Sequence, residues 1–176
     1  MTNEKFLPDD YEPPKGESRY MKFTEGANKF RVLSTPIIGW EDWKDKKPHR
    51  YTINNKPEKP FGKNPIKHFW AFVVWNYQTE AINILEITQM GIMNTIRALS
   101  RSENWGSPFG YDIVVERKGK DLETEYTVTP DPPSEIDDII KKSYRDMKIN
   151  LDALFSGDDP FGETTTVTED NDNLPF

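Results

Sequence analysis

The chain has 176 residues, of which 35% are hydrophobic and 30% are charged, and its formal net charge is -7. It contains no cysteine, so disulfides and thiolate zinc sites are excluded, and we expect neither a metal ion nor another cofactor. No apolar run approaches the length of a membrane span, and the first residues lack the pattern of a secretory signal, so we expect a cytoplasmic protein.

The charge is divided between two segments of the chain. Residues 152–176 contain seven acidic residues and no lysine or arginine, whereas residues 44–67 contain eight basic residues against Asp45 and Glu58. A low overall pI therefore does not exclude a polyanionic ligand. The eight bases are Lys44, Lys46, Lys47, Arg50, Lys56, Lys59, Lys63 and Lys67.

Alternating apolar residues predict a first strand over residues 28–40, with a bend or bulge at Ser34-Thr35-Pro36. Residues 41–65 carry four prolines and show no helical period, so we expect a long functional or disordered loop. Residues 67–88 predict an apolar hairpin turning at Thr79 and Glu80. In that register Tyr77 faces Ile82, and the further pairs are Trp75 with Ile84, Val74 with Leu85, Val73 with Glu86 and Phe72 with Ile87.

A helical period follows in residues 88–99, with Thr88 as the expected cap and Ile92, Met93, Ile96 and Leu99 as the buried face. Residues 111–118 and 122–129 predict a second hairpin. Ser134 with Asp137 resembles a capping box that opens a helix reaching Met147. Beyond Phe155 the composition predicts disorder.

Five strands with one helix between the third and fourth is the order of an OB-fold, so we expect a mainly β protein built on a five-stranded barrel. The expected parts are a flexible N-terminal arm (1–19), an OB-fold domain (20–131), a C-terminal helix (132–155) and a disordered acidic tail (156–176). This topology alone does not establish a function.

The chain carries no phosphate-binding glycine loop, paired-histidine motif or nucleophile elbow, so we do not expect an enzyme. The carboxylate pair Glu41-Asp42 leaves a small nuclease, or a nuclease inhibitor, as an alternative.

The basic segment interleaves cations with aromatic rings, which together neutralise phosphates and stack on bases. One face of the first hairpin would extend this surface. The candidate DNA-binding residues are Arg31, Trp40, Trp43, Lys44, Lys46, Lys47, Arg50, Tyr51, Phe61, Lys63, Lys67, Phe69, Trp75, Tyr77, Lys118 and Lys120. Ordinary packing of these rings, with the lysines simply solvated, is the competing interpretation.

The chain ends in acidic residues followed by Leu174-Pro175-Phe176, and residues 158–161 repeat part of this pattern. This end resembles the acidic tails of bacterial and bacteriophage single-stranded DNA-binding proteins, and residues 28–33, Trp40, Trp43 and residues 125–128 look closer to phage members. Asn171 and Asn173 stand where the family has acids. A phage-encoded protein would act in the host cytoplasm.

The resemblance implies a non-catalytic protein that binds single-stranded DNA without strong sequence preference. It also implies that the tail recruits replication, recombination and repair proteins, or folds over the DNA groove when DNA is absent. An OB-fold module that binds protein or RNA is the alternative, and a homo-oligomer remains open. The implied docking residues are Asp170, Asp172, Leu174, Pro175 and Phe176.

Overall fold

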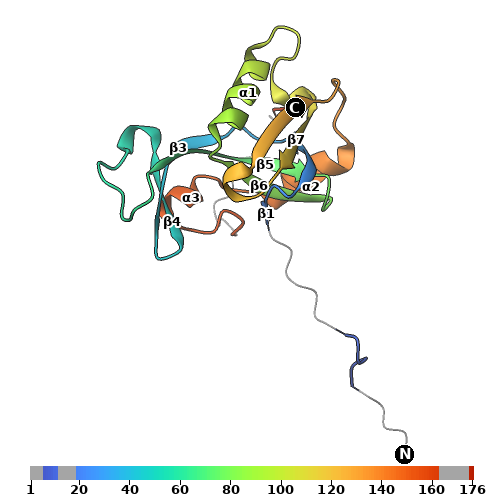
Figure 1. The fold of residues 1–176 in the computed structure, drawn as a ribbon. Helices are drawn as coiled ribbons and strands as arrows, with labels where there is room; N and C mark the ends of the chain where they lie inside the picture. Colours follow the sequence, from blue (N-terminus) through green and yellow to red (C-terminus); the bar gives the residue numbers. More distant parts are fainter. Residues whose placement is uncertain (1–5, 12–18, 163–174) are drawn as a thin grey trace, which may run out of the picture.

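The computed structural model describes residues 6–11, 19–162 and 175–176, and most of its regular structure is β-strand (Figure 1). The strands are β1 (Tyr20–Met21), β2 (Gly26–Val32), β3 (Ile37–Lys44), β4 (Lys47–Thr52), β5 (Lys67–Asn76), β6 (Ala81–Ile87), β7 (Asp112–Lys118) and β8 (Glu125–Pro130). The α-helices are α1 (Met90–Arg101), α2 (Asp138–Met147) and α3 (Ala153–Ser156), and the 3-10 turns are η1 (Ile53–Asn55), η2 (Pro108–Gly110) and η3 (Asp121–Glu123).

All eight described strands belong to one sheet, in the order β1-β6-β5-β2-β7-β8, with β3 pairing to β5 and β4. The sheet is open, so the expected closed five-stranded barrel is not found among the described residues. The free edge of β6 is taken by the short strand β1, which pairs in parallel through Tyr20 with Ile84 and Met21 with Leu85. The helix α1 does lie between the two hairpins in the chain, as predicted.

The predicted bend in the first strand is confirmed, because β2 ends at Val32 and β3 begins at Ile37. Both halves pair with β5, through Val32 with Val74 and Ile37 with Ala71. At the bend the Ser34 hydroxyl accepts a hydrogen bond of 2.8 Å from the Val73 amide. The predicted first strand therefore forms two strands that both pair with β5. The second of them, β3, also pairs with β4.

The two predicted hairpins form, but with longer loops. Trp75 faces Ile82 and Val73 faces Ile84, a shift of two residues from the predicted register, because residues 77–80 rather than two residues make the turn. A shift of two leaves each side chain on its predicted face. In the second hairpin Lys118 faces Glu125, and η3 lies in the loop.

One face of the sheet packs against α1. The predicted helical face is confirmed for Ile92, Met93 and Ile96, which are buried with Phe72 and Val74, while Leu99 is half-buried beside them. Thr88 is not the cap, because Gln89 occupies that position without a side-chain hydrogen bond. The main core therefore lies between α1 and the even-numbered side chains of β5.

The opposite face of the sheet is covered by segments that follow β8. Residues from α2 pack on Val73 and Ile82, and Leu154 of α3 packs on Phe69 and Ala71. Asp137 caps α2 by accepting from the Ile139 amide, so Ser134 is not its cap. Two separate helices thus replace the single expected C-terminal helix.

Residues 156–162, which the composition places in a disordered tail, also pack on this face. Pro160 is buried, and the Phe161 ring lies edge-on to Tyr20 at 6.2 Å between centroids. The guanidinium of Arg19 lies 5.0 Å from the same ring. The remaining expected tail residues, 163–174, lie outside the described part of the chain, as do the expected arm residues 1–5 and 12–18.

Candidate nucleic-acid interface

The expected loop at residues 41–65 begins as a β-hairpin that extends from the sheet. Strands β3 and β4 pair through Trp40 with Tyr51 and through Asp42 with His49, across a turn at Asp45-Lys46. Directly paired residues share one side of a sheet, so the alternate residues of both strands form a common surface. We call this surface the hairpin face; its residues are Trp40, Asp42, Lys44, Lys47, His49 and Tyr51.

The connection after β4 adds a further ring to the hairpin face. The Phe61 amide donates to Asp42 Oδ2 at 2.8 Å, which holds this part of the connection against β3. The Phe61 ring is 51% exposed and lies 5.2 Å from the His49 ring. Lys44 Nζ lies 5.2 Å from the Phe61 centroid. A cation and two rings therefore meet at the outer end of the hairpin.

A second group of rings and cations lies nearer the sheet. Trp40 Nε1 donates to the Ile53 carbonyl at 3.0 Å, and its ring lies 5.1 Å from His68. Lys56 Nζ lies 4.3 Å from the centroid of the Trp40 ring. The DNA-binding residues predicted from the sequence do not include His49, His68 or Lys56. The alternation of Lys47, His49 and Tyr51 is the signal that would have placed His49 here.

The other side of the hairpin carries a buried arginine that pairs with two carboxylates. Arg50 Nη2 lies 2.6 Å from Glu86 Oε2, Arg50 Nε lies 3.3 Å from Glu41 Oε2, and Trp43 Nε1 donates to Glu41 Oε1 at 2.7 Å. The Arg50 side chain is only 11% exposed. Arg50 was predicted to contact DNA, but two carboxylates occupy its guanidinium. It therefore supports the hairpin from behind instead of offering charge to a phosphate.

Glu41 and Glu86 both face the guanidinium of Arg50. Burial raises the pKa of Glu86 to about 8, with further contributions from the hydrogen bond and charge of Glu41, while Arg50 acts in the opposite direction. Glu41 Oε2 has no hydrogen-bond partner among the described residues. The base of the hairpin thus holds one more carboxylate than its arginine can balance.

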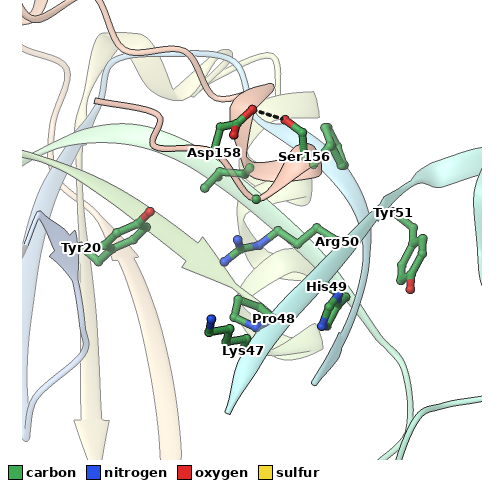
Figure 2. Close-up of a pocket in the computed structure, with 11 residues that line it drawn as sticks. Tyr20, Lys47, Pro48, His49, Arg50, Tyr51, Ser156 and Asp158 are labelled. Carbon is green, nitrogen blue, oxygen red and sulfur yellow. Dashed lines mark hydrogen bonds between the residues drawn. The ribbon is translucent and has the colours of Figure 1, made fainter. Parts of the chain in front are cut away.

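A cavity of about 470 Å³ lies between β4 and the segment around α3 (Figure 2). Arg50 extends into it toward Tyr20, whereas the Tyr51 side chain points away from it on the other side of β4. On the opposite wall the Ser156 hydroxyl hydrogen-bonds Asp158 Oδ2 at 3.0 Å. The cavity and Arg50 therefore lie on one side of β4, and the Tyr51 side chain of the hairpin face lies on the other.

Two predicted DNA-binding residues are buried, and the structure corrects their expected exposure. Arg31 is 1% exposed, with Nε 2.7 Å from Asp112 Oδ1, and Phe69 is fully buried beside Leu154. The outward side of β2 and the odd-numbered side of β5 were predicted to be accessible. Arg31 is enclosed by Phe109, Asp112 and Ser134, and Phe69 is covered by α3. The sequence pattern of the strands does not reveal this cover.

Four further predicted residues lie elsewhere in the sheet. Trp75 is half-buried beside the cluster of Leu33 and Ile82. The Tyr77 hydroxyl donates to Asp112 Oδ1 at 2.8 Å, and burial together with this hydrogen bond raises the pKa of Tyr77. The other two, Lys118 and Lys120, are exposed at the β7–β8 loop, and β7 pairs only with β2 and β8.

The structure brings the rest of the predicted set together on or beside the hairpin. Trp43 is 49% exposed, and the lysines of the turn, the connection and the start of β5 all face solvent. These predicted residues are Trp40, Trp43, Lys44, Lys46, Lys47, Tyr51, Phe61, Lys63 and Lys67.

Part of the chain is similar to a known phage protein. Over 64 residues it is 33% identical to a protein of Escherichia phage T5 named "Probable ssDNA-binding protein". The similar stretch covers 36% of this chain and 24% of the phage protein, so it spans about a quarter of that relative. No family model matches the chain, and no solved structure matches it at a significant level.

The carboxylate pair Glu41-Asp42 is divided between the two sides of β3. Asp42 holds the Phe61 amide, and Glu41 meets Arg50 and Trp43 on the other side, so the two carboxylates do not converge on one point. Within residues 6–11, 19–162 and 175–176, no group of three acidic or histidine side chains is placed to hold a metal ion. No helix in the same ranges is long and apolar enough to cross a membrane.

The expected docking tail is described only at its last two residues. Asp170, Asp172 and Leu174 lie outside the described part of the chain, whereas Pro175 is exposed and Phe176 is half-buried. The Phe176 ring lies 5.9 Å from Tyr144 of α2. Phe176 therefore contacts the α2 side of the body and not the hairpin face.

Proposed function

We propose that the chain binds single-stranded DNA through the hairpin face without strong sequence preference. The observation that carries this proposal is the meeting of accessible rings and lysines on one surface, with Lys44 beside Phe61 and Lys56 beside Trp40. Lysines neutralise phosphates, and exposed rings provide stacking platforms that accept any base. The partial similarity to the phage T5 protein supports the same ligand.

The lysines that lie over the rings do not block stacking. An exposed cation–π contact contributes about 0.5–1 kcal/mol, whereas a base stacked on an aromatic ring contributes about 1–3 kcal/mol. A base therefore displaces the lysine from the ring. The displaced ammonium remains within reach of the phosphate next to that base, so both interactions are made by the same pair of side chains.

We also propose that the sheet is an opened form of the OB-fold. The chain supplies β2 with β3, then β5, β6, α1, β7 and β8, which is the expected order of strands and helix, and the successive pairs are antiparallel. Proteins with this fold bind oligonucleotides on one side of the barrel and on its loops. In this chain the β3–β4 hairpin takes the place of a long loop beside that surface.

Residues 170–176 are proposed to recruit replication, recombination and repair proteins. An acidic segment followed by an apolar Leu-Pro-Phe end suits a partner with a hydrophobic pocket rimmed by basic residues. The acids steer the approach, and the Phe176 ring supplies the apolar contact.

A fluorescence titration tests the DNA-binding proposal. Oligo-dT should quench the fluorescence of Trp40 on the hairpin face, whereas duplex DNA of the same length should bind more weakly, because its bases are already stacked. Repeating the titration at several salt concentrations gives the number of phosphates neutralised. Equal binding of duplex and single strand, or no binding of oligo-dT at low salt, would contradict the proposal.

A further inference from the structure

The Phe176 ring packs against α2 and forms one wall of an open groove between α2 and η2. The ring packs beside Ile136 and Ile140 and lies tilted against Tyr144 at 5.9 Å between centroids. The groove has a volume of about 440 Å³, and Phe109 and Lys141 also line it. An aromatic side chain from the distant end of the chain thus packs on an apolar part of the body, beside this groove.

The walls of this groove are held together by Arg31. Its Nη1 donates to the Phe109 carbonyl at 3.1 Å, and its Nη2 donates to the carbonyl and the hydroxyl of Ser134 at 3.0 and 2.7 Å. Asp112 fixes the same guanidinium through Nε at 2.7 Å. None of these bonds involves Phe176, so the part of the groove around Arg31 does not depend on the ring. A site that is held in place beforehand costs less to bind.

The groove is separate from the hairpin face. None of its lining residues belongs to β3 or β4, and the end of the chain marked C lies beside β7, away from β4 (Figure 1). A ring held in the groove leaves the hairpin face open. This arrangement differs from a tail that competes with DNA for the same cations.

We propose that the groove is a receptor for the Pro175–Phe176 segment of the same chain, recognised chiefly through the Phe176 ring. The body then holds the recruitment segment on the α2 side and keeps its aromatic residue from other proteins until a partner binds it more tightly. This consequence for recruitment depends on the proposed function, whereas the receptor itself does not.

The test uses the full-length chain and a labelled peptide with the sequence of residues 171–176. Tethered groups experience effective concentrations in the millimolar range, so the groove is occupied in the native chain only if the free peptide has a Kd below about 1 mM. A peptide of about 0.1 mM Kd would bind the wild-type chain roughly tenfold more weakly than a Phe176→Ala chain, because a tether at about 1 mM competes with it. Fluorescence anisotropy measures both affinities.

Two variants make the result specific. Phe6→Ala removes a phenylalanine that is 96% exposed, and it should behave as the wild type. Adding Tyr144→Ala to Phe176→Ala should weaken peptide binding, because the ring loses its aromatic neighbour. Equal peptide affinity for the wild type and Phe176→Ala, or no binding to Phe176→Ala at several millimolar peptide, would overturn the proposal.

The DNA-binding proposal and the receptor proposal can fail independently. Peptide binding is measured without DNA, so a chain that does not bind oligo-dT can still show the receptor. Saturating oligo-dT should leave peptide binding to the wild-type chain unchanged. An increase in peptide binding on adding oligo-dT would show that DNA releases Phe176, and would refute a receptor independent of the hairpin face.

Discussion

Replacing Lys44, Lys46 and Lys47 by glutamine should reduce both the affinity for single strands and its dependence on salt. All three lysines are exposed at the end of the β3–β4 hairpin. Each phosphate neutralised on a single strand contributes about -0.7 to the slope of log K against log salt, so losing three contacts should flatten the slope by about 2. The wild-type affinity should then fall about 16-fold more than that of the variant between 50 and 200 mM salt.

The assay is the oligo-dT titration at four or more salt concentrations, with a second triple variant of equal net charge. Lys22, Lys142 and Lys148 are exposed and lie outside the hairpin, so their replacement by glutamine should leave the slope almost unchanged. Exposed substitutions of this kind change the free energy of unfolding by less than about 0.5 kcal/mol each. Equal losses in the two triple variants would mean that overall charge, and not the hairpin face, determines the affinity.

Three further predictions concern the support of the hairpin. Phe61→Ala should weaken oligo-dT binding by about 5- to 150-fold, the value of one stacked base, in the same titration. The pKa of Glu86 is about 8 in the folded chain, compared with an ordinary value of 4.5, so the folded state binds the carboxyl proton of Glu86 more tightly than the unfolded state does. The free energy of unfolding should therefore fall as the pH rises from 5 to 8. Urea unfolding of Glu86→Gln should lose that decrease. Gly39→Ala should lower the melting temperature by several degrees, because a Cβ there would overlap a carbonyl oxygen of β4, whereas Gly110→Ala meets open space and should not.

The outline of the sheet could be predicted from the sequence, because it depends on local patterns. The alternation in β2, the apolar run of β5 and the period of α1 mark elements that the structure contains. The β3–β4 hairpin was missed because its turn, Asp45-Lys46, contains no glycine. Both residues adopt positive φ values of 53° and 62°, which glycine or asparagine usually signals. Pro48 lies within β4, and proline usually argues against a strand, so β4 was not predicted.

The errors in the candidate site have a different cause, which is packing between distant segments. Arg31 alternates with Phe30 and Val32 and so was predicted to face solvent, but its partner Asp112 lies 81 residues further along the chain. Phe69 is covered by Leu154 in the same way. The segment around Pro160 and Phe161 has the composition of a disordered tail, yet Pro160 is buried and the Phe161 ring packs against Tyr20. Strand periodicity identifies the two faces of a strand but not which of them another segment will cover.

Among the cations of the predicted interface, Arg31 and Arg50 are largely buried, whereas the lysines are exposed. Arg31 and Arg50 are inside, where fixed carboxylates and carbonyls surround the planar guanidinium, and the exposed cations of the hairpin are lysines. Arginine suits fixed groups of acceptors, whereas the lysine ammonium is a hydrated point charge on a flexible stem. Reading of base edges depends mainly on side chains that make paired hydrogen bonds, arginine above all. A surface that presents lysines and rings therefore neutralises phosphates and stacks on bases while discriminating little between sequences, so oligonucleotides of different base composition should bind the hairpin face with similar affinity.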